Sequence, residues 1–207
     1  MNTRTTHQTL VQPINKLNSN VKLYDALKAS YSDKGQQQKT MSQSGYVRDN
    51  KLSNSNEQVY FNPSQKKLLY SVAVTHNAAD WGTDVALAFG HLKDTNRYRE
   101  ARDTLATAKT KYRTNATVIG HSLGSTIGSY IAGPNDTFVG YNGGFTIGQK
   151  TYKNATNLRT RGDLVSLLGA RTTGVHTFAN KNKSSNIVSN VLSAHNLENL
   201  KGSAIFV

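Results

Sequence analysis

The chain contains no cysteine among its 207 residues. This absence excludes a disulfide framework, a thiolate metal site and a cysteine nucleophile, and it fits a reducing compartment better than an oxidising one. Acidic residues are also scarce, with 12 Asp and Glu against 25 Lys and Arg, which gives a formal net charge of +13. A chain this basic favours acidic surroundings, such as anionic lipid, nucleic acid or an acidic assembly partner.

Long apolar runs are missing as well. No segment approaches the length of a membrane span, and residues 1–8 are polar and lack the apolar core of a cleavable signal peptide. We therefore expect a cytoplasmic or virion-associated protein rather than a secreted one. The sequence has no zinc-finger spacing, no ribonucleoprotein signature and no basic heptads, so it carries no specific nucleic-acid motif. We expect neither a cofactor nor a metal ion.

The length fits one domain that is large enough to bury a hydrophobic core. Residues 1–20 are rich in Asn, Gln and Thr, so we expect an extended or disordered arm there, followed by a single domain over residues 21–207. Residues 32–56 are again polar. They predict a loop, or an arm that becomes ordered only against other structure.

Hydrophobic periodicity predicts helices alternating with strands. Helical spacing predicts helices at 21–31 and 96–112, and another helical stretch starts at Asp80 and Trp81 and ends at Gly90. Strand-like runs occupy residues 58–61, 67–74, 117–119, 137–141, 155–159 and 174–178. A strand, a crossover helix and a second strand in that order favour a right-handed parallel unit. We therefore expect an α/β fold with a mostly parallel central sheet flanked by helices.

The strongest local pattern is Gly-His-Ser-Leu-Gly at residues 120–124, which follows a β-branched run and precedes a segment of small residues. The pattern Gly-x-Ser-x-Gly is typical of a nucleophile elbow, a tight strand-to-helix turn that exposes the serine Oγ in a strained conformation. The flanking glycines are needed because side chains there would collide with the neighbouring strand and helix. In a chain with 16 glycines one match could arise by chance, so the other catalytic groups have to be sought.

A serine hydroxyl needs an imidazole within hydrogen-bond reach and an acid that orients the imidazole. In the α/β-hydrolase order the acid follows the serine and the histidine comes last. The candidate acids after Ser122 are Asp136, Asp163, Glu198 and the C-terminal carboxylate. We favour Asp163 because it comes just after a predicted strand, where its carboxylate would emerge at the carboxyl edge of the sheet. Glu198 is expected to cap or solvate the last helix.

Two histidines follow the serine in the chain. His176 alternates within a predicted strand and is expected to be a packed or surface strand residue. His195 lies in a predicted loop that enters a short helical segment, which is where a catalytic histidine is needed. His121 is inside the elbow pattern, and we do not assign it the role of the base.

Four segments, in this order along the chain, resemble the class 3 (fungal-type) lipase family of α/β-hydrolases over about residues 57–200. They are Asp80-Trp81 with Asp84, the elbow at 120–124, Arg161-Gly162-Asp163-Leu164-Val165, and Ala194-His195-Asn196-Leu197-Glu198-Asn199. The resemblance implies an α/β-hydrolase fold. It also implies a triad with Ser122 as nucleophile, His195 as general base and acid, and Asp163 as orienting acid.

The resemblance further implies an oxyanion hole, with one departure from the family pattern. The first expected donor is the backbone N–H of Leu123, and the second would come from around His76 or Asn77. The family usually has Arg-Gly-Thr where this chain has Thr75-His76-Asn77. The loss of one good donor costs a few kcal/mol of transition-state stabilisation, roughly a hundredfold in rate. Residues 91–100 are polar and charged, so interfacial activation by an apolar lid is not supported.

These patterns predict a serine esterase or lipase that hydrolyses acyl esters of lipids, phospholipid or acylglycerol, through an acyl-enzyme. The basic charge favours an anionic membrane surface as the place of action. The alternative is a non-catalytic or weakly active hydrolase fold that serves as a structural or assembly component, for example of a virion, through its basic surface. A third interpretation, nucleic-acid binding through charge alone, predicts a steeply salt-dependent affinity.

Overall fold

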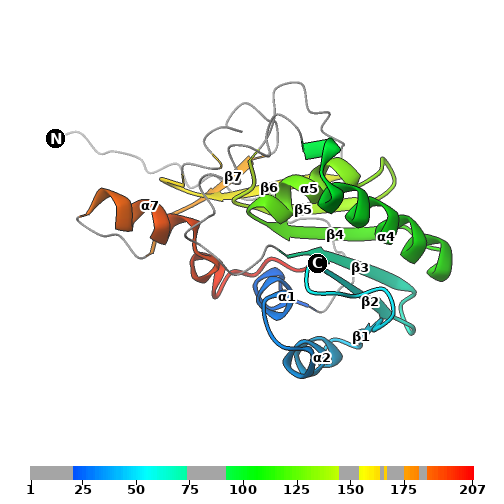
Figure 1. The fold of residues 1–207 in the computed structure, drawn as a ribbon. Helices are drawn as coiled ribbons and strands as arrows, with labels where there is room; N and C mark the ends of the chain where they lie inside the picture. The colour runs from blue at the N-terminus through cyan, green and yellow to red at the C-terminus, as the bar shows by residue number, and fades with distance from the viewer. Residues whose placement is uncertain (1–20, 74–91, 145–153, 164–165, 167–174, 182–185) are drawn as a thin grey trace.

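One β-sheet with helices on both faces forms the centre of the molecule (Figure 1). The computed structural model describes residues 21–73, 92–144, 154–163, 166, 175–181 and 186–207. The helices in these ranges are α1 (Leu23–Ser30), α2 (Lys34–Ser42), α4 (Asn96–Tyr112), α5 (Leu123–Ile131) and α7 (Ile187–His195), with 3-10 helices η1 (Leu92–Asp94) and η2 (Leu197–Leu200). The strands are β1 (Val47–Arg48), β2 (Glu57–Asn62), β3 (Lys67–Val72), β4 (Ala116–His121), β5 (Thr137–Tyr141), β6 (Ala155–Thr160) and β7 (Val175–Phe178).

The seven strands lie in the sheet in the order in which they occur in the chain. β1, β2 and β3 pair antiparallel, and every neighbouring pair from β3 to β7 is parallel. The sheet is therefore mostly parallel and the fold is α/β, which confirms the prediction from the sequence. The carboxyl ends of β3 to β7 meet at one edge of the sheet, and residues that directly follow these strands are gathered there.

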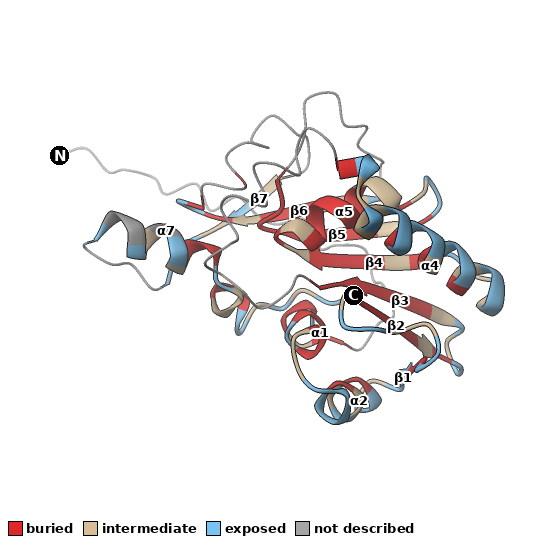
Figure 2. Ribbon diagram, viewed as in Figure 1, coloured by how far each residue is buried: buried red, intermediate tan, exposed pale blue. Residues whose placement is uncertain are grey.

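Different helices cover the two faces of the sheet (Figure 1). Two successive residues of β4 pack on opposite faces of the sheet. Val118 belongs to the hydrophobic cluster with α4 and α5, whereas Ile119 belongs to the cluster with α1. Figure 2 shows the buried residues concentrated on the strands and on the helix surfaces that face them. Right-handed connections between parallel strands in sequential order put successive crossovers on the same face, and α4 and α5 share one face.

Helix α4 forms where the sequence predicts it. The side chain of Thr95 caps its first turn by accepting the Tyr98 N–H, and the helix ends at Arg113 in the left-handed conformation. One side of α4 carries an apolar stripe that faces the sheet, and its residues Ala101, Leu105 and Ala108 are buried. The stripe therefore fixes α4 on the sheet as the crossover between β3 and β4.

Residues 32–56 contain more regular structure than their polar composition suggests. They form α2 and β1, and Met41 of α2 is fully buried against α1. Buried hydrogen bonds also join α2, β1 and β2. Nε of the buried Arg48 donates to Gln37 Oε1 at 2.8 Å and to Gln58 Oε1 at 3.0 Å. The loop prediction is wrong for these residues, and the alternative, order acquired against other structure, agrees with the packing.

Some predicted features lie outside the described residues. They are the arm at 1–20, the helical stretch from Asp80 to Gly90 and the segment Thr75-His76-Asn77. The division into an arm and one domain over 21–207 therefore stays a prediction. Among the helices of the described residues, none combines the length and the apolar character that crossing a membrane requires.

Asp136 fixes the amino end of β4. Its fully buried carboxylate binds Lys109 Nζ at 2.7 Å and accepts the backbone N–H groups of Ala116 at 2.9 Å and Gly133 at 2.8 Å. Ala116 is the first residue of β4, so this carboxylate lies at the opposite end of the strand from Ser122. Asp136 is therefore a structural group, which agrees with the preference for Asp163 as the acid.

We expect Asp136→Ala to lower the free energy of unfolding by about 2–4 kcal/mol, because it leaves two backbone N–H groups and a half-buried ammonium without their acceptor. Urea denaturation measures the change. The matched control is Asp103→Ala, because that carboxylate is 66% exposed and pairs with Arg102 at the surface; we expect a loss below about 0.5 kcal/mol. Equal losses in the two variants would contradict the structural role of Asp136.

Candidate active site

Ser122 lies at the junction of β4 and α5 in a strained backbone conformation. Its φ is 59° and its ψ is −131°, which side-chain-bearing residues rarely adopt, at a cost of about 1–3 kcal/mol. Its N–H donates to the carbonyl of Tyr141 at 3.0 Å, so β4 remains paired with β5 up to the turn. This is the geometry of a tight strand-to-helix turn, as the pattern at 120–124 predicts.

The flanking glycines have the steric role expected of them. A Cβ on Gly120 would lie 2.4 Å from the carbonyl oxygen of Gly124, and a Cβ on Gly124 would lie 2.2 Å from the carbonyl oxygen of Val72 in β3. Both distances are shorter than any tolerated contact, and both involve backbone atoms that cannot rotate away. The first turn of α5 therefore contacts β3 and β4 directly, and the turn that carries Ser122 has no room to relax.

Asp163 and His195, which are 32 residues apart in the chain, are joined by a hydrogen bond. Nδ1 of His195 donates to Oδ1 of Asp163 at 2.9 Å, and the exposed fractions of the two side chains are 11% and 0%. Because a carboxylate only accepts, Nδ1 carries the hydrogen, and in the neutral ring Nε2 carries the lone pair. Nε2 is buried as well. The pair therefore presents a base of defined tautomer.

The two residues of this pair come from the turn after β6 and from the end of α7. Asp163 follows β6 after a short turn, and its second oxygen accepts the backbone N–H of Ser166 at 3.3 Å. His195 is the last residue of α7, so its placement in a loop was wrong, although the 3-10 helix η2 follows as predicted. The side chains of Ser166 and Asp163 are both buried, which protects the acid from water.

The end of α7 is fixed by side chains from the carboxyl ends of β4 and β5. The last carbonyls of a helix have no partner within it, and here three consecutive carbonyls accept hydrogen bonds from the sheet. The bonds are Asn142 Nδ2 to Ala194 O at 3.1 Å, His121 Nε2 to His195 O at 2.9 Å, and Tyr141 Oη to Asn196 O at 3.2 Å. His195 is thereby brought to the edge of the sheet at which Ser122 lies.

His121 is the functional candidate that the sequence reasoning missed. Its ring centroid lies 4.8 Å from that of His195 and 5.5 Å from that of Tyr141. Its burial and then the neighbouring His195 lower the pKa of His121 from 6.5 to about 3. Ser122 follows His121 directly, so the ring contact also brings the serine into the neighbourhood of His195. The available signal was its position at the end of the elbow strand.

The first expected oxyanion donor lies in the described structure and the second does not. Leu123 is the first residue of α5, where backbone N–H groups have no carbonyl partner within the helix. His76 and Asn77 are outside the described residues, and Ala73 is the last described residue after β3. The guanidinium of Arg97 on α4 donates to the Ala73 carbonyl and fixes the point from which the segment with His76 departs.

Two other candidates from the sequence lie apart from this pair. Glu198 accepts the Tyr24 hydroxyl at 2.6 Å and the Lys28 ammonium at 3.1 Å, so it links η2 to α1 instead of capping a helix. His176 lies on β7, paired in register with Leu158, as a strand residue should. Neither contacts Asp163 or His195 by a hydrogen bond among the described residues.

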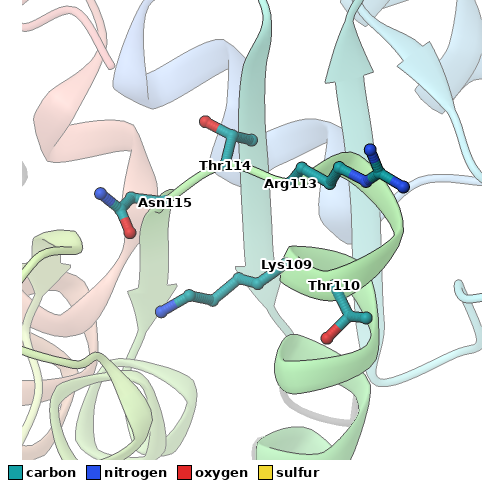
Figure 3. Close-up of a pocket in the computed structure, with 5 residues that line it drawn as sticks. All are labelled: Lys109, Thr110, Arg113, Thr114 and Asn115. Carbon is teal, nitrogen blue, oxygen red and sulfur yellow. The ribbon is translucent and has the colours of Figure 1, made fainter.

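A polar hollow of about 500 Å³ lies at the other end of the sheet (Figure 3). Its lining residues are Lys109, Thr110, Arg113, Thr114 and Asn115. They come before β4, and the Lys109 ammonium is already bound to Asp136, so we assign the hollow no role in the chemistry at Ser122. Within the described part of the chain no three His, Asp or Glu side chains are arranged to hold a metal ion.

We expect Gly124→Ala to be more destabilising than Gly128→Ala, although both glycines lie in α5. The new Cβ meets a backbone oxygen at 2.2 Å in the first case and a ring atom of Phe138 at 3.1 Å in the second. The difference in the free energy of unfolding should be at least about 2 kcal/mol, measured by chemical denaturation. Equal stability of the two variants would show that α5 can move away from β3.

The low pKa of His121 makes stability depend on pH. Between the ordinary pKa of 6.5 and the folded value of about 3, the unfolded chain binds a proton that the folded chain does not. The free energy of unfolding therefore does not depend on the protonation of His121 above pH 6.5. As the pH falls from 6.5 towards 3, the free energy of unfolding decreases by at most about 1.4 kcal/mol per pH unit. Urea denaturation at pH 7 and 5 should show a smaller loss for His121→Gln than for the unchanged chain. The same loss in both would refute the low pKa.

Comparisons with known proteins find similarity among solved structures but not among family models or curated proteins. No protein-family model matches the chain, and no curated protein matches it. Among solved structures the chain is similar to the Lip2 lipase from Yarrowia lipolytica, with a TM-score of 0.46 and 13% sequence identity, over 76% of this chain and 76% of that one. The similarity concerns the course of the chain alone.

Proposed function

We propose that this protein is a serine hydrolase that cleaves acyl esters, with Ser122 as nucleophile, His195 as general base and acid, and Asp163 as orienting acid. The observation that carries the proposal is the buried hydrogen bond of 2.9 Å between His195 Nδ1 and Asp163 Oδ1. It fixes the tautomer that a base needs, at the edge of the sheet where the strained Ser122 lies. An acid, a base and a strained serine in this arrangement are the parts that acyl transfer requires.

In the acylation step the Ser122 hydroxyl oxygen attacks the ester carbonyl carbon while Nε2 of His195 takes the hydroxyl proton. The carbonyl oxygen becomes an oxyanion, and the backbone N–H of Leu123 at the start of α5 donates to it. The tetrahedral intermediate collapses when the C–O bond to the alcohol breaks and His195 returns the proton to the leaving oxygen. The products of this step are the free alcohol and an acyl ester of Ser122.

In the deacylation step a water molecule takes the place of the alcohol. His195 removes one proton from the water as its oxygen attacks the acyl carbon, and then gives that proton to the Ser122 oxygen as the ester bond breaks. The carboxylic acid leaves and the serine is regenerated. Asp163 keeps its negative charge throughout and stabilises the imidazolium that forms twice in each cycle.

Lipid esters at an anionic surface are the substrates that we propose. The net charge of +13 supports this choice, because a basic protein is concentrated at an anionic interface. Leu192 on α7, the helix that ends at His195, is 52% exposed and offers an apolar side chain near the site. Hydrolysis of vesicles that contain anionic lipid should then be faster than hydrolysis of uncharged vesicles, and the difference should shrink with added salt.

A fluorophosphonate probe tests the proposal without knowledge of the substrate, because it reports only whether a serine is activated. We expect the purified chain to be labelled, Ser122→Ala to be unlabelled, and Asp163→Asn to react about ten-thousandfold more slowly because the wrong tautomer of His195 becomes accessible. Asp103→Asn is the matched control, since that carboxylate is exposed, and it should react like the unchanged chain.

Absence of labelling in a folded, monodisperse sample would refute the hydrolase proposal. The high positive charge would then favour the alternative, a hydrolase fold that acts as a structural or assembly component. Labelling that survives in Ser122→Ala would show that another serine reacts, and it would refute the assignment of the nucleophile.

A further inference from the structure

Both ring nitrogens of His121 are engaged, and together they define its state. Nε2 lies 2.9 Å from the backbone carbonyl of His195, which only accepts, so Nε2 carries the hydrogen. In the neutral ring Nδ1 then carries the lone pair, and it accepts the hydroxyl of Tyr31 at 3.1 Å. The hydroxyl group, the imidazole and the carbonyl form a chain of hydrogen bonds that runs in one direction. None of these groups has a part in the reaction steps proposed above.

We propose that His121 is a positioning residue for His195, and that it acts by holding the backbone carbonyl of His195 and packing against the His195 ring. The inference rests on the proposed function, since His195 needs exact placement only if it serves Ser122. His121 belongs to the same turn as the nucleophile, so it connects the position of the base to the position of the serine. One side chain thereby couples two catalytic groups that are 73 residues apart in the chain.

The contact is made at the end of α7, where helix carbonyls need partners from outside the helix. His195 ends α7, and its carbonyl has no partner within that helix. Asn142 and Tyr141 hold the carbonyls of the residues on either side. The hydrogen bond from His121 is made to the carbonyl of His195 itself, and the ring contact at 4.8 Å restricts the side chain as well.

The surroundings of His121 favour its neutral form. Among the described residues the titratable groups that face its ring are Tyr31 at the end of α1, Tyr141 on β5 and His195 on α7, and Asp163 is hydrogen-bonded to His195. No carboxylate among the described residues contacts His121. During acylation His195 becomes a cation, and a neutral neighbour avoids the repulsion that a second imidazolium would cause.

Substitutions at position 121 can separate the hydrogen bond from the ring. Glutamine carries its amide nitrogen about as far from the backbone as Nε2, so His121→Gln can still donate to the His195 carbonyl. Asparagine carries its amide nitrogen about as far as Nδ1, so His121→Asn cannot reach that carbonyl. The two variants have the same chemical groups and differ only in reach. His176→Gln changes a histidine on β7 and serves as the control.

The first measurement is the rate of fluorophosphonate labelling across pH. We expect His121→Asn to react about tenfold to a hundredfold more slowly than the unchanged chain, His121→Gln to recover most of that loss, and His176→Gln to match the unchanged chain. Equal rates for the Asn variant and the unchanged chain would overturn the inference.

The second measurement does not depend on activity. Long-range ¹H–¹⁵N spectra of the full chain identify the tautomer of each histidine, and we expect Nε2–H for His121 and Nδ1–H for His195. In His121→Asn the His195 signals should report a mixture of tautomers, and in His121→Gln they should not. Unchanged His195 signals in the Asn variant would overturn the positioning role. If the unchanged chain is never labelled, the proposed function fails, while these spectra still decide whether His121 fixes His195.

Discussion

The site depends on how closely α5 approaches the sheet. Gly120 and Gly124 let the first turn of α5 contact the backbone of β3 and β4 at distances where any Cβ would collide. Ser122, at the start of this close-packed turn, has a positive φ of 59°. The strain of about 1–3 kcal/mol at such a residue persists only where the surroundings fix it. Here the Ser122 N–H stays paired with Tyr141, and the Ser125 hydroxyl lies where side chains on Gly140 and Gly143 would be.

A second constraint joins the C-terminal segment to this rigid turn. The end of α7 is held by side chains from β4 and β5, while Glu198 in η2 binds Tyr24 and Lys28 on α1. The segment that carries His195 is therefore fixed on both sides of the histidine by α1, β4 and β5, which lie far before it in the sequence. These contacts span between 52 and 174 residues, and they order the base only when the whole sheet has formed. The proposed catalytic geometry is consequently a property of the complete fold.

Local patterns predicted those features that local physics controls. Alternating and helical periodicities predicted α1, α4 and the strands β2 to β7. The preference for Asp163 and His195 came from their places after a predicted strand and before a short helical segment, and a hydrogen bond joins the two residues in the structure. The same reasoning missed α2, because its burial depends on a polar network around Arg48 that composition alone does not distinguish from a solvated loop. It also set His121 aside, since its role follows from a contact with a residue 74 positions away. The neighbouring sequence shows that His121 ends the elbow strand, but it does not show which distant residue its ring contacts.

Two imidazoles at a ring separation of 4.8 Å receive opposite properties from their neighbours. His195 has a carboxylate as its hydrogen-bond partner, whereas His121 is half-buried with a hydroxyl and a carbonyl as partners, and this environment favours its neutral ring. Of the two rings, only that of His195 is hydrogen-bonded to a carboxylate of the described residues, and the position of Asp163 makes this difference. In the proposed mechanism the distant histidine, which has the carboxylate partner, takes the proton, and the histidine beside Ser122 has the positioning role.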